Sequence, residues 1–373
     1  MFRIQLAETT GYGDRLLLAI TVGLVLFGVL MVYSASAVMA QQEYNNQFYF
    51  FTKQVFAALV GVLGMIALTK FDYKHLKNPM VVYGLIFIAV FFLGLVLLLP
   101  PVKGTHRFIR IPGFSFQPSE LAKIALVVFL AYFLEKRAGE IRDLKRTFIP
   151  AVIISGFLMG MVLLGKDLGT TLIMALVTGV MLIVSGVPIR YMGVCILPVL
   201  PLLYWQLFHV AYRFERLKAF LDPWQYARDE GFQVVQSLIA VGSGGVKGLG
   251  LSQGKQKLFY LPEAHTDFIY AVISEELGLI GSGIVVLLFL LFLWRGIRSA
   301  RHAPDMFGCM LALGFCVMIV SQAFFNMSVV LSLVPAKGIP LPFISYGGTS
   351  LMFSLIAVGV ILNVSNYINS ENS

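Results

Sequence analysis

The groups best suited to proton transfer lie together in the stretch YLPEAHTDFIYAVISEELG. Glu263, His265 and Asp267 stand at the start of an apolar run, and Glu275 and Glu276 follow inside it. An ionisable group inside a membrane costs about 3 kcal/mol or more, so it persists mainly where it lines a wet cavity or does chemistry. Asp267 is therefore predicted to be catalytic, at the boundary of water and lipid, where an enzyme would act on a lipid head group.

Asp267 has a structural interpretation as well, because a carboxylate also caps the N-terminus of a helix. A cap needs only one acid, however, and Glu263 and His265 remain as candidate substrate-binding residues. The positions three, four, seven and eleven beyond Asp267 share one helical face and are small or polar, as a cavity wall requires: Tyr270, Ala271, Ser274 and Gly278. Glu275 and Glu276 are interpreted as structural, paired within the bundle.

A second cluster surrounds Pro118, which suits the first turn of a helix because its missing N–H would be unpaired there. Glu120 and Lys123 are three positions apart, so they share one helix face and can form an ion pair. The pair either closes the helix end or takes part in binding, with Lys123 neutralising an anionic substrate that Glu120 positions. Arg107, just before this helix, is a further candidate for binding substrate.

Two more clusters have both a structural and a functional interpretation. Asp167 lies at the tip of a predicted helical hairpin, where it either caps a helix or belongs to the site. Arg213 and Arg216 open a long polar segment. Their guanidinium groups either clamp phosphate with two parallel hydrogen bonds or extend along the end of a helix.

The last cluster is the segment KGIPLPFISYGGT, which runs from Lys337 to Thr349. Its two prolines and two adjacent glycines interrupt a helix. Non-helical backbone at membrane depth is tolerated only where protein or water surrounds it. The segment is therefore either a re-entrant loop lining a cavity or a plain surface turn, and Lys337 and Ser345 are candidate substrate-binding residues.

The composition identifies the class of protein that carries these clusters. Of 373 residues, 58% are hydrophobic and 13% are charged, about half the charged fraction of a soluble domain. The net charge of +9 comes from positions scattered over loops, which argues against nucleic acid as a partner. The three cysteines lie in apolar runs and indicate neither a disulfide framework nor a metal site.

Apolar runs of about 20 residues predict an all-α polytopic membrane protein with about ten transmembrane helices. The predicted spans are 16–38, 52–70, 80–100, 118–135, 147–165, 168–187, 189–210, 267–295, 306–333 and 348–369. Pro188 favours a break between the sixth and seventh. The first run is long and lacks a cleavage site, so it is expected to remain as the first helix.

The lysines and arginines predict the orientation. They cluster in the loops on the side of the two termini, which the positive-inside rule assigns to the cytoplasm. The opposite loop at 39–51 contains no lysine or arginine. Both termini are thus expected to be cytoplasmic, in a single membrane domain covering 1–373.

A long extracytoplasmic loop is predicted at 211–266, between helices 7 and 8. Its glycine-rich piece, GSGGVKGLG, is not placed between a strand and a helix in a βαβ unit, so a nucleotide-binding loop is not indicated. Flexibility, or a close approach of backbone to a substrate, accounts better for these glycines.

The motifs taken together resemble those of the SEDS family, the FtsW/RodA group of bacterial cell-wall polymerases, over essentially the whole chain. The matching segments are MVYSAS at 31–36, FQPSE at 116–120 with Lys123, DLGT at 167–170, FLDPW at 220–224, GSGG at 242–245, LPEAHTDF at 261–268 and the segment 337–348. The alanine in PEAHTDF and the MVYSAS segment are more similar to the division members, the FtsW type, than to the elongation members.

The resemblance implies a ten-span glycosyltransferase of the bacterial cytoplasmic membrane that polymerises lipid II at the outer face during cell division, at the septum. It also implies a class B penicillin-binding protein and other division proteins as partners. The family's essential aspartate corresponds to Asp267, which we expect to act as a general base on the acceptor sugar hydroxyl. Arg107, Lys123, Arg213, Arg216 and Lys337 are candidates to stabilise the polyprenyl pyrophosphate leaving group, with a divalent cation (Mg²⁺ or Mn²⁺) as an optional cofactor.

Two other functions fit the same residues. Charges inside a membrane also mark transport paths, so the chain could flip lipid II across the bilayer. It could also be a scaffold for division proteins with no catalysis of its own. The crowding of polar clusters on the outer face favours the polymerase.

Overall fold

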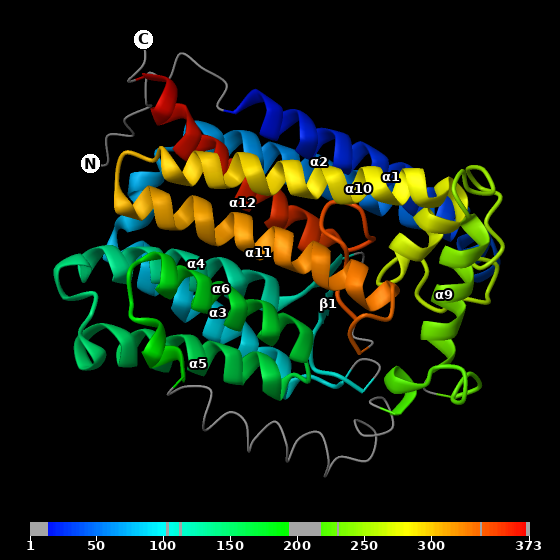
Figure 1. Cartoon of the computed structure of the whole chain (residues 1–373), viewed down its shortest axis with the longest axis horizontal. Helices are drawn as coiled ribbons and strands as arrows, with labels where there is room; N and C mark the ends of the chain where they lie inside the picture. Colours follow the sequence, from blue (N-terminus) through cyan, green and yellow to red (C-terminus); the bar gives the residue numbers. More distant parts are fainter. Residues whose placement is uncertain are drawn as a thin grey trace.

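The computed structural model describes residues 14–101, 104–111, 114–193, 218–229, 231–335 and 338–370. Long helices run side by side along the molecule, and one shorter helix, α9, stands across one end of the bundle (Figure 1). The long helices are α1 (Arg15–Tyr44), α2 (Tyr49–Lys70), α3 (Pro79–Leu98), α4 (Pro118–Lys136), α5 (Ile149–Leu164), α6 (Leu168–Val184), α10 (Ile269–Arg301), α11 (Met306–Val330) and α12 (Gly348–Ser370).

Shorter elements join these helices. They are η1 (Tyr73–Lys77), η2 (Ala138–Glu140), η3 (Leu144–Phe148), α9 (Phe232–Gly244), β1 (Ile109–Ile111) and β2 (Phe114–Phe116). The two strands form an antiparallel hairpin, which the all-α prediction did not include. The helix α9 lies inside the range 211–266, which the sequence predicts to be a long loop. Its 13 residues are apolar but too few to cross a membrane.

Nine of the ten predicted spans coincide with helices of the described part of the chain. The remaining range, 189–210, lies almost entirely outside the described residues. Among the described helices, seven are long and apolar enough to cross a membrane, and the chain is a multi-pass helical membrane protein. The other two are α4, which contains four charged residues, and α6, which has 17 residues.

Local sequence explains where several helices begin. Asp14, Asp167 and Asp305 each accept a hydrogen bond from a backbone N–H in the first turn of α1, α6 and α11. Pro118 occupies the first turn of α4, as the sequence predicts. Asp167 is thus a helix cap.

The helices differ sharply in burial. In the most apolar 18-residue stretch, 78% of positions are buried in both α11 and α12, against 22% in α3. Side chains exposed on the outer helices are large and apolar, such as Phe87 (70% exposed) on α3 and Leu279 (67%) on α10. Helices α4, α11 and α12 therefore form the core, since 15 of the 19 residues of α4 are also buried. The peripheral helices present apolar surface to hydrocarbon.

Helix α10 is broken at Gly278, where φ is 65° and ψ is −162°. The glycine-rich segment enters this break. The N–H of Leu279 donates to the carbonyl of Gly245 (2.9 Å), and that of Gly250 donates to Glu276 (2.9 Å). A Cβ added to Gly248 would lie 2.1 Å from the carbonyl oxygen of Glu276. The glycines thus allow the backbone to approach α10, whereas the sequence favours flexibility or a close approach of backbone to a substrate.

Glu275 and Glu276 are buried structural acids, as predicted. Glu276 accepts hydrogen bonds from Lys257 Nζ (2.6 Å), from the hydroxyl of Ser34 on α1 (2.8 Å) and from the N–H of Ser252 (3.0 Å). Glu275 accepts from the backbone N–H of residue 255 (2.8 Å). These bonds fix the segment before Asp267 against α1 and α10.

Candidate active site

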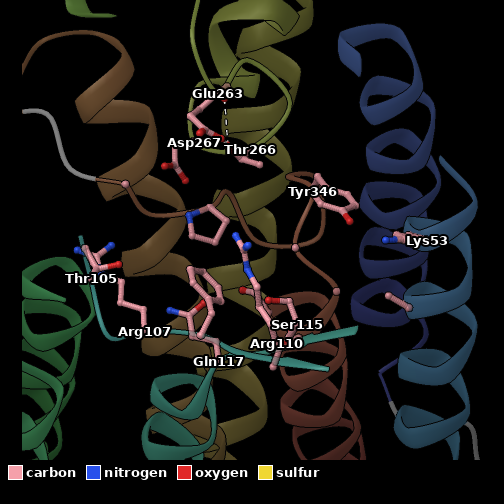
Figure 2. A pocket seen from close by; sticks show the side chains of 18 of the residues that line it. Lys53, Thr105, Arg107, Arg110, Ser115, Gln117, Glu263, Thr266, Asp267 and Tyr346 are labelled. Atoms are coloured by element: carbon pink, nitrogen blue, oxygen red, sulfur yellow. Dashed lines mark hydrogen bonds between the residues drawn. The ribbon is translucent and has the colours of Figure 1, made fainter. Parts of the chain in front are cut away.

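A cavity of about 680 Å³ lies where α2 and α12 begin and just before α10 begins. This is the end of the bundle remote from Asp14, whose N–H donates to Ser365 Oγ near the end of α12 (2.9 Å). Figure 2 shows the charged and polar side chains of the lining. The lining consists of Thr52, Lys53, Phe56, Ala57, Thr105, Arg107, Phe108, Arg110, Ser115, Gln117, Glu263, Thr266, Asp267, Gly338, Pro340, Tyr346, Gly347, Gly348, Thr349 and Ser350.

Asp267 lies on this lining, one residue before the N-cap position of α10, which is Phe268. The backbone of Asp267 is fixed, because Asn326 Nδ2 on α11 donates to its carbonyl (2.7 Å) and to that of Ile339 (2.7 Å). A Cβ added to Gly338 would lie 2.5 Å from Asp267 Oδ2. Glycine at 338 is therefore needed for the carboxylate to occupy this place.

The segment 338–347 is a buried loop that lines the cavity. Phe343 (1% exposed) packs between Phe289 and Phe292 of α10, and Ile344 is fully buried. Gln54 on α2 holds the loop through its amide, which donates to the carbonyl of Ser345 (3.1 Å). The sequence left open a re-entrant loop or a surface turn, and the burial excludes the surface turn.

Glu120 and Lys123 lie beneath this loop, away from the cavity surface. Their side chains are only 4% and 3% exposed, and Lys123 Nζ lies 3.0 Å from Glu120 Oε1. Lys123 also donates to Gln322 Oε1 (2.6 Å), whose Nε2 donates to the carbonyl of Pro340 (3.0 Å). Of the two interpretations, the geometry favours the structural pair, which supports the loop opposite Asp267.

His265 and Ser345 are also buried next to the cavity and do not line it. The ring of His265 packs against Phe50 (4.6 Å between centroids) and Tyr346 (5.7 Å). Ser345 Oγ donates to the carbonyl of Thr266 and accepts from the N–H of Leu341 (2.7 Å). Both residues join the loop before α10 to the loop before α12.

Glu263, a predicted substrate-binding residue, lines the cavity beside Asp267. Its φ of 54° lies in the left-handed region, and Thr266 Oγ1 donates to its carboxylate (3.1 Å). Figure 2 shows Glu263, Thr266 and Asp267 on the same wall of the cavity. The two carboxylates predicted from the motif PEAHTD are thus brought together.

Arg107 reaches the cavity from the segment before β1, and its guanidinium is partly engaged elsewhere. Nη2 donates to the carbonyl of Lys166, and Nη1 lies 4.0 Å from Asp167 Oδ1. Asp167 in turn accepts from Ser119 (3.2 Å). Arg107 therefore ties the segment before the hairpin to the start of α6.

Lys53, Arg110 and Tyr346 are among the cavity residues that were not selected as candidate site residues from the sequence. Lys53 is a lysine near the start of α2, at the end of the span opposite the basic loops. It is an exception to the expected charge distribution, which could have marked it. Arg110 stands opposite Ser115 in the hairpin, an element that the sequence pattern does not predict. Burial, with the phenol groups of Tyr49 and Tyr44 nearby, raises the pKa of Tyr346 to about 12, so its hydroxyl is a donor at neutral pH and not a base.

Arg213, Arg216 and Lys337 lie outside the described residues, so their predicted roles stay predictions. Within the described part of the chain, no group of three or more His, Cys, Asp or Glu side chains has the arrangement of a metal site.

The fold and the cavity define an integral membrane protein with a cavity at one end of a helical bundle, and charged side chains, among them the Asp267 carboxylate, line that cavity. The chain belongs to the cell cycle protein family of FtsW, RodA and SpoVE, whose sequence pattern matches residues 14–370.

Relatives with curated names match over nearly the whole chain. A probable peptidoglycan glycosyltransferase FtsW of Geobacter sp. (strain M18) is 47% identical, covering 95% of this chain and 97% of the relative. The stage V sporulation protein E of Bacillus subtilis (strain 168) is 42% identical, covering 95% of this chain and 97% of that protein.

Solved structures of similar fold include a chain from a study of how a peptidoglycan synthase complex coordinates polymerization and crosslinking. It is 26% identical with a TM-score of 0.77, covering 95% of this chain and 98% of that one. The rod shape determining protein RodA of Thermus thermophilus is 25% identical with a TM-score of 0.69, covering 95% and 96%.

Proposed function

We propose that this protein is a peptidoglycan glycosyltransferase that polymerises lipid II at the outer face of the bacterial cytoplasmic membrane, with Asp267 as the general base. The observation that carries the proposal is the fixed Asp267 carboxylate on a cavity that also contains Lys53, Arg107 and Arg110. A base beside cations suits a transfer in which a hydroxyl attacks and a diphosphate leaves. The names of the relatives support the same activity.

In this reaction, Asp267 takes the proton from a sugar hydroxyl of one lipid-linked substrate. The hydroxyl oxygen forms a bond to the anomeric carbon of the other substrate, and the bond from that carbon to the diphosphate oxygen breaks. The electron pair leaves with the polyprenyl diphosphate, whose charge the cavity cations stabilise. One base and a stabilised leaving group suffice for such an inverting displacement, in contrast to the paired carboxylates of a glycosidase.

The interior below the cavity argues against a transporter. Residues 124–131 of α4 are apolar and buried, and they lie directly beyond the Glu120–Lys123 pair. The polar groups of the described site instead gather at one end of the bundle, which suits chemistry at a single face.

A divalent cation fits the cavity only in part. Mg²⁺ is typically held by one or two carboxylates together with substrate phosphates. Glu263 and Asp267 are the carboxylates of the described lining. These two residues would hold such an ion, which would neutralise phosphate charge.

Partners and location follow from the same proposal. A class B penicillin-binding protein would crosslink the strands that this chain polymerises, and the two would work with other division proteins at the septum. The similarity to a chain of a peptidoglycan synthase complex supports such a partner. Both termini would be cytoplasmic, which puts the cavity on the outer side.

The test is the purified protein with its penicillin-binding partner and lipid II. Asp267→Ala and Asp267→Asn are expected to lose about a hundredfold to ten-thousandfold in polymer formation. Glu43→Gln, which removes an exposed acid at the same end of the molecule, serves as the control. Near-normal polymer from either Asp267 variant rejects the assignment, and full complementation of division by both variants supports a scaffold.

A further inference from the structure

The segment that follows α9, residues 245–260, is held at a fixed depth along α10. The N–H of Leu249 donates to the carbonyl of Glu275 (3.0 Å), and the N–H of Ile280 donates to the carbonyl of Val246 (3.2 Å). Figure 1 shows this segment at the end of the bundle where α9 stands and α10 begins. The start of the segment is therefore level with the break in α10.

Two polar contacts between α1 and α10 measure the distance from this level to the basic end of the bundle. At the basic end, Arg295 Nε donates to Asp14 Oδ2 (2.6 Å). At the other, Ser34 Oγ donates to Glu276 Oε1 (2.8 Å). Ser34 follows Asp14 by 20 positions, and Glu276 precedes Arg295 by 19. At about 1.5 Å per residue the two contacts are roughly 30 Å apart, which is the thickness of the hydrocarbon core.

The segment 245–260 thus lies at the boundary of the hydrocarbon core, and it continues an apolar face of α10. Leu279 and Ile280, just beyond the break, are exposed on that face, and so are Val246, Leu249 and Leu251 on the segment. A contiguous exposed apolar surface marks a contact with a partner or a membrane. Because this surface adjoins a helix face that lies in hydrocarbon, the geometry favours lipid.

Exposed cations accompany these apolar side chains. Lys247 and Lys255 are exposed, and the segment 245–260 contains no acidic residue. Lys257 is buried by contrast, and its Nζ pairs with Glu276 Oε1 (2.6 Å), so it serves the attachment to α10. Two exposed ammonium groups at the level of the lipid head groups match the phosphates of anionic phospholipids.

Two aromatic residues end the segment. Phe259 and Tyr260 are more than half exposed, and aromatic rings are enriched at the boundary between hydrocarbon and water. The N–H of Leu261 donates to the carbonyl of Gln256 (2.8 Å), so the chain turns back immediately after them. Asp267 follows Tyr260 by seven positions. The segment therefore connects the membrane boundary to the wall of the cavity.

We propose that the segment 245–260 is an interfacial anchor in the leaflet at the cavity end of the protein. Val246, Leu249 and Leu251 insert among the upper acyl chains, and Lys247 and Lys255 bind the phosphates of anionic phospholipids. The anchor is a surface that the proposed glycosyl transfer does not use, so it holds whether or not Asp267 is the base.

The experiment measures the depth of single nitroxide spin labels on the full-length protein in nanodiscs of phosphatidylcholine and phosphatidylglycerol. The native cysteines are replaced by alanine, and labels are attached to Leu249→Cys or Leu251→Cys. Oxygen concentrates in hydrocarbon, whereas a nickel chelate stays in water. Both labels are expected to collide more often with oxygen than with the chelate, because the anchor lies within the leaflet.

Two matched labels calibrate the depth. Gln42→Cys, on α1 eight positions beyond Ser34, is exposed and should collide more often with the chelate. Leu287→Cys, exposed on α10 within the span, should show the largest excess of oxygen. If the labels at 249 and 251 respond like the label at 42, the segment lies in water and the anchor is wrong. Protection of water-exposed labels only after the penicillin-binding partner is added also overturns it, since a protein then covers the surface.

A second arm tests the two lysines. The label at 249 is expected to lie deeper in nanodiscs that contain phosphatidylglycerol than in phosphatidylcholine alone. Each lysine near an anionic surface strengthens association roughly fivefold, so Lys247→Gln combined with Lys255→Gln should abolish this shift. Lys145→Gln, which removes an exposed cation at the opposite end, should retain it. Equal depth of the parent's label in the two lipids contradicts the binding of anionic phospholipid.

The anchor and the proposed base fail in different ways. Asp267→Asn is expected to leave the depth of both labels unchanged while forming no polymer. If Asp267→Asn polymerises normally, the base is wrong and the depth measurement stands by itself. If Asp267→Asn is inactive and the labels at 249 and 251 lie in water, the anchor is wrong and the proposed function stands.

Discussion

At the scale of single residues, the position of Asp267 depends on two neighbouring residues. Asn326 holds its carbonyl, and Gly338 leaves room for its carboxylate. A general base must be placed within hydrogen-bond reach of the proton it takes, so small displacements matter. Substitutions at Asn326 and Gly338 therefore test the role of Asp267 as directly as substitution of its carboxylate.

Gly338→Ala tests this placement. The new Cβ would lie 2.5 Å from Asp267 Oδ2, so the carboxylate has to move. A displacement of about 1 Å can lower a rate about a hundredfold, and we expect that loss in polymerisation with little change in melting temperature.

The control for this variant is Gly347→Ala in the same loop. Its added Cβ would be 3.7 Å from the nearest atom, Ser350 Cβ, which is ordinary contact. Activity of Gly338→Ala equal to that of the parent would contradict the placement of Asp267 by Gly338.

The sequence predicts part of the site and misses the rest for identifiable reasons. Asp267 and Glu263 stand out because charges at the start of an apolar run are costly. The spacing of Glu120 and Lys123 predicts their ion pair but not whether it faces substrate, since that depends on Gln322 more than 190 positions away. Lys53 is the second residue of the predicted span 52–70. A single lysine at this position is interpreted as marking the end of a helix and not as a binding residue.

At the scale of elements, α4 and α11 support the loop before α12. The chain of contacts runs from Glu120 through Lys123 and Gln322 to the carbonyl of Pro340. Removing one partner of a buried ion pair leaves the other charge uncompensated. Substitution of one residue of the pair and substitution of both are therefore expected to have different effects on stability.

Lys123→Met is expected to lower the free energy of unfolding by about 3 kcal/mol or more, because Glu120 stays buried and unpaired. The double variant Glu120→Met and Lys123→Met should regain most of the melting temperature and part of the polymerisation. A double variant with full stability and no polymer would instead indicate direct contact of Lys123 or Glu120 with substrate.

The break in α10 gives a second prediction at this scale. Gly278 has φ of 65°, and an added Cβ would lie 2.4 Å from the N of Gly248. Gly278→Ala is expected to lower the free energy of unfolding by about 2 kcal/mol or more. Gly283→Ala in the same helix has nothing within 4 Å of the new Cβ and should leave the melting temperature unchanged or slightly higher.

The elements also show what a pattern of hydropathy can predict. Long apolar runs predict nine helices that the structure describes, because each has to cross or line the same hydrocarbon thickness. The hairpin of β1 and β2 has three residues per strand and no such pattern. The glycine-rich segment is understood only once Gly278 is known to break α10, a contact between distant parts of the chain.

At the scale of the whole molecule, the two ends of the bundle differ in character. One end has the cavity and its mixture of cations and carboxylates. The other has the basic loops with Lys70, Lys74, Arg142 and Lys145, together with the first residue of α1 and the last turns of α12. The positive-inside rule then predicts that the cavity opens to the outside.

This orientation can be measured with single cysteines, introduced after the native cysteines are replaced by alanine. Gln42→Cys, on an exposed stretch at the cavity end, should react with a membrane-impermeant thiol reagent added to intact spheroplasts. Lys145→Cys, exposed at the opposite end, should react only after the membrane is opened. The reverse pattern would contradict the proposed topology.

The most direct measurement of the central claim is the rate of glycan strand extension by Asp267→Asn, with binding of a polyprenyl diphosphate measured on the same preparation. The account predicts a rate at least about a hundredfold below that of the parent, with unchanged binding. A rate within a few-fold of the parent at equal binding would contradict it.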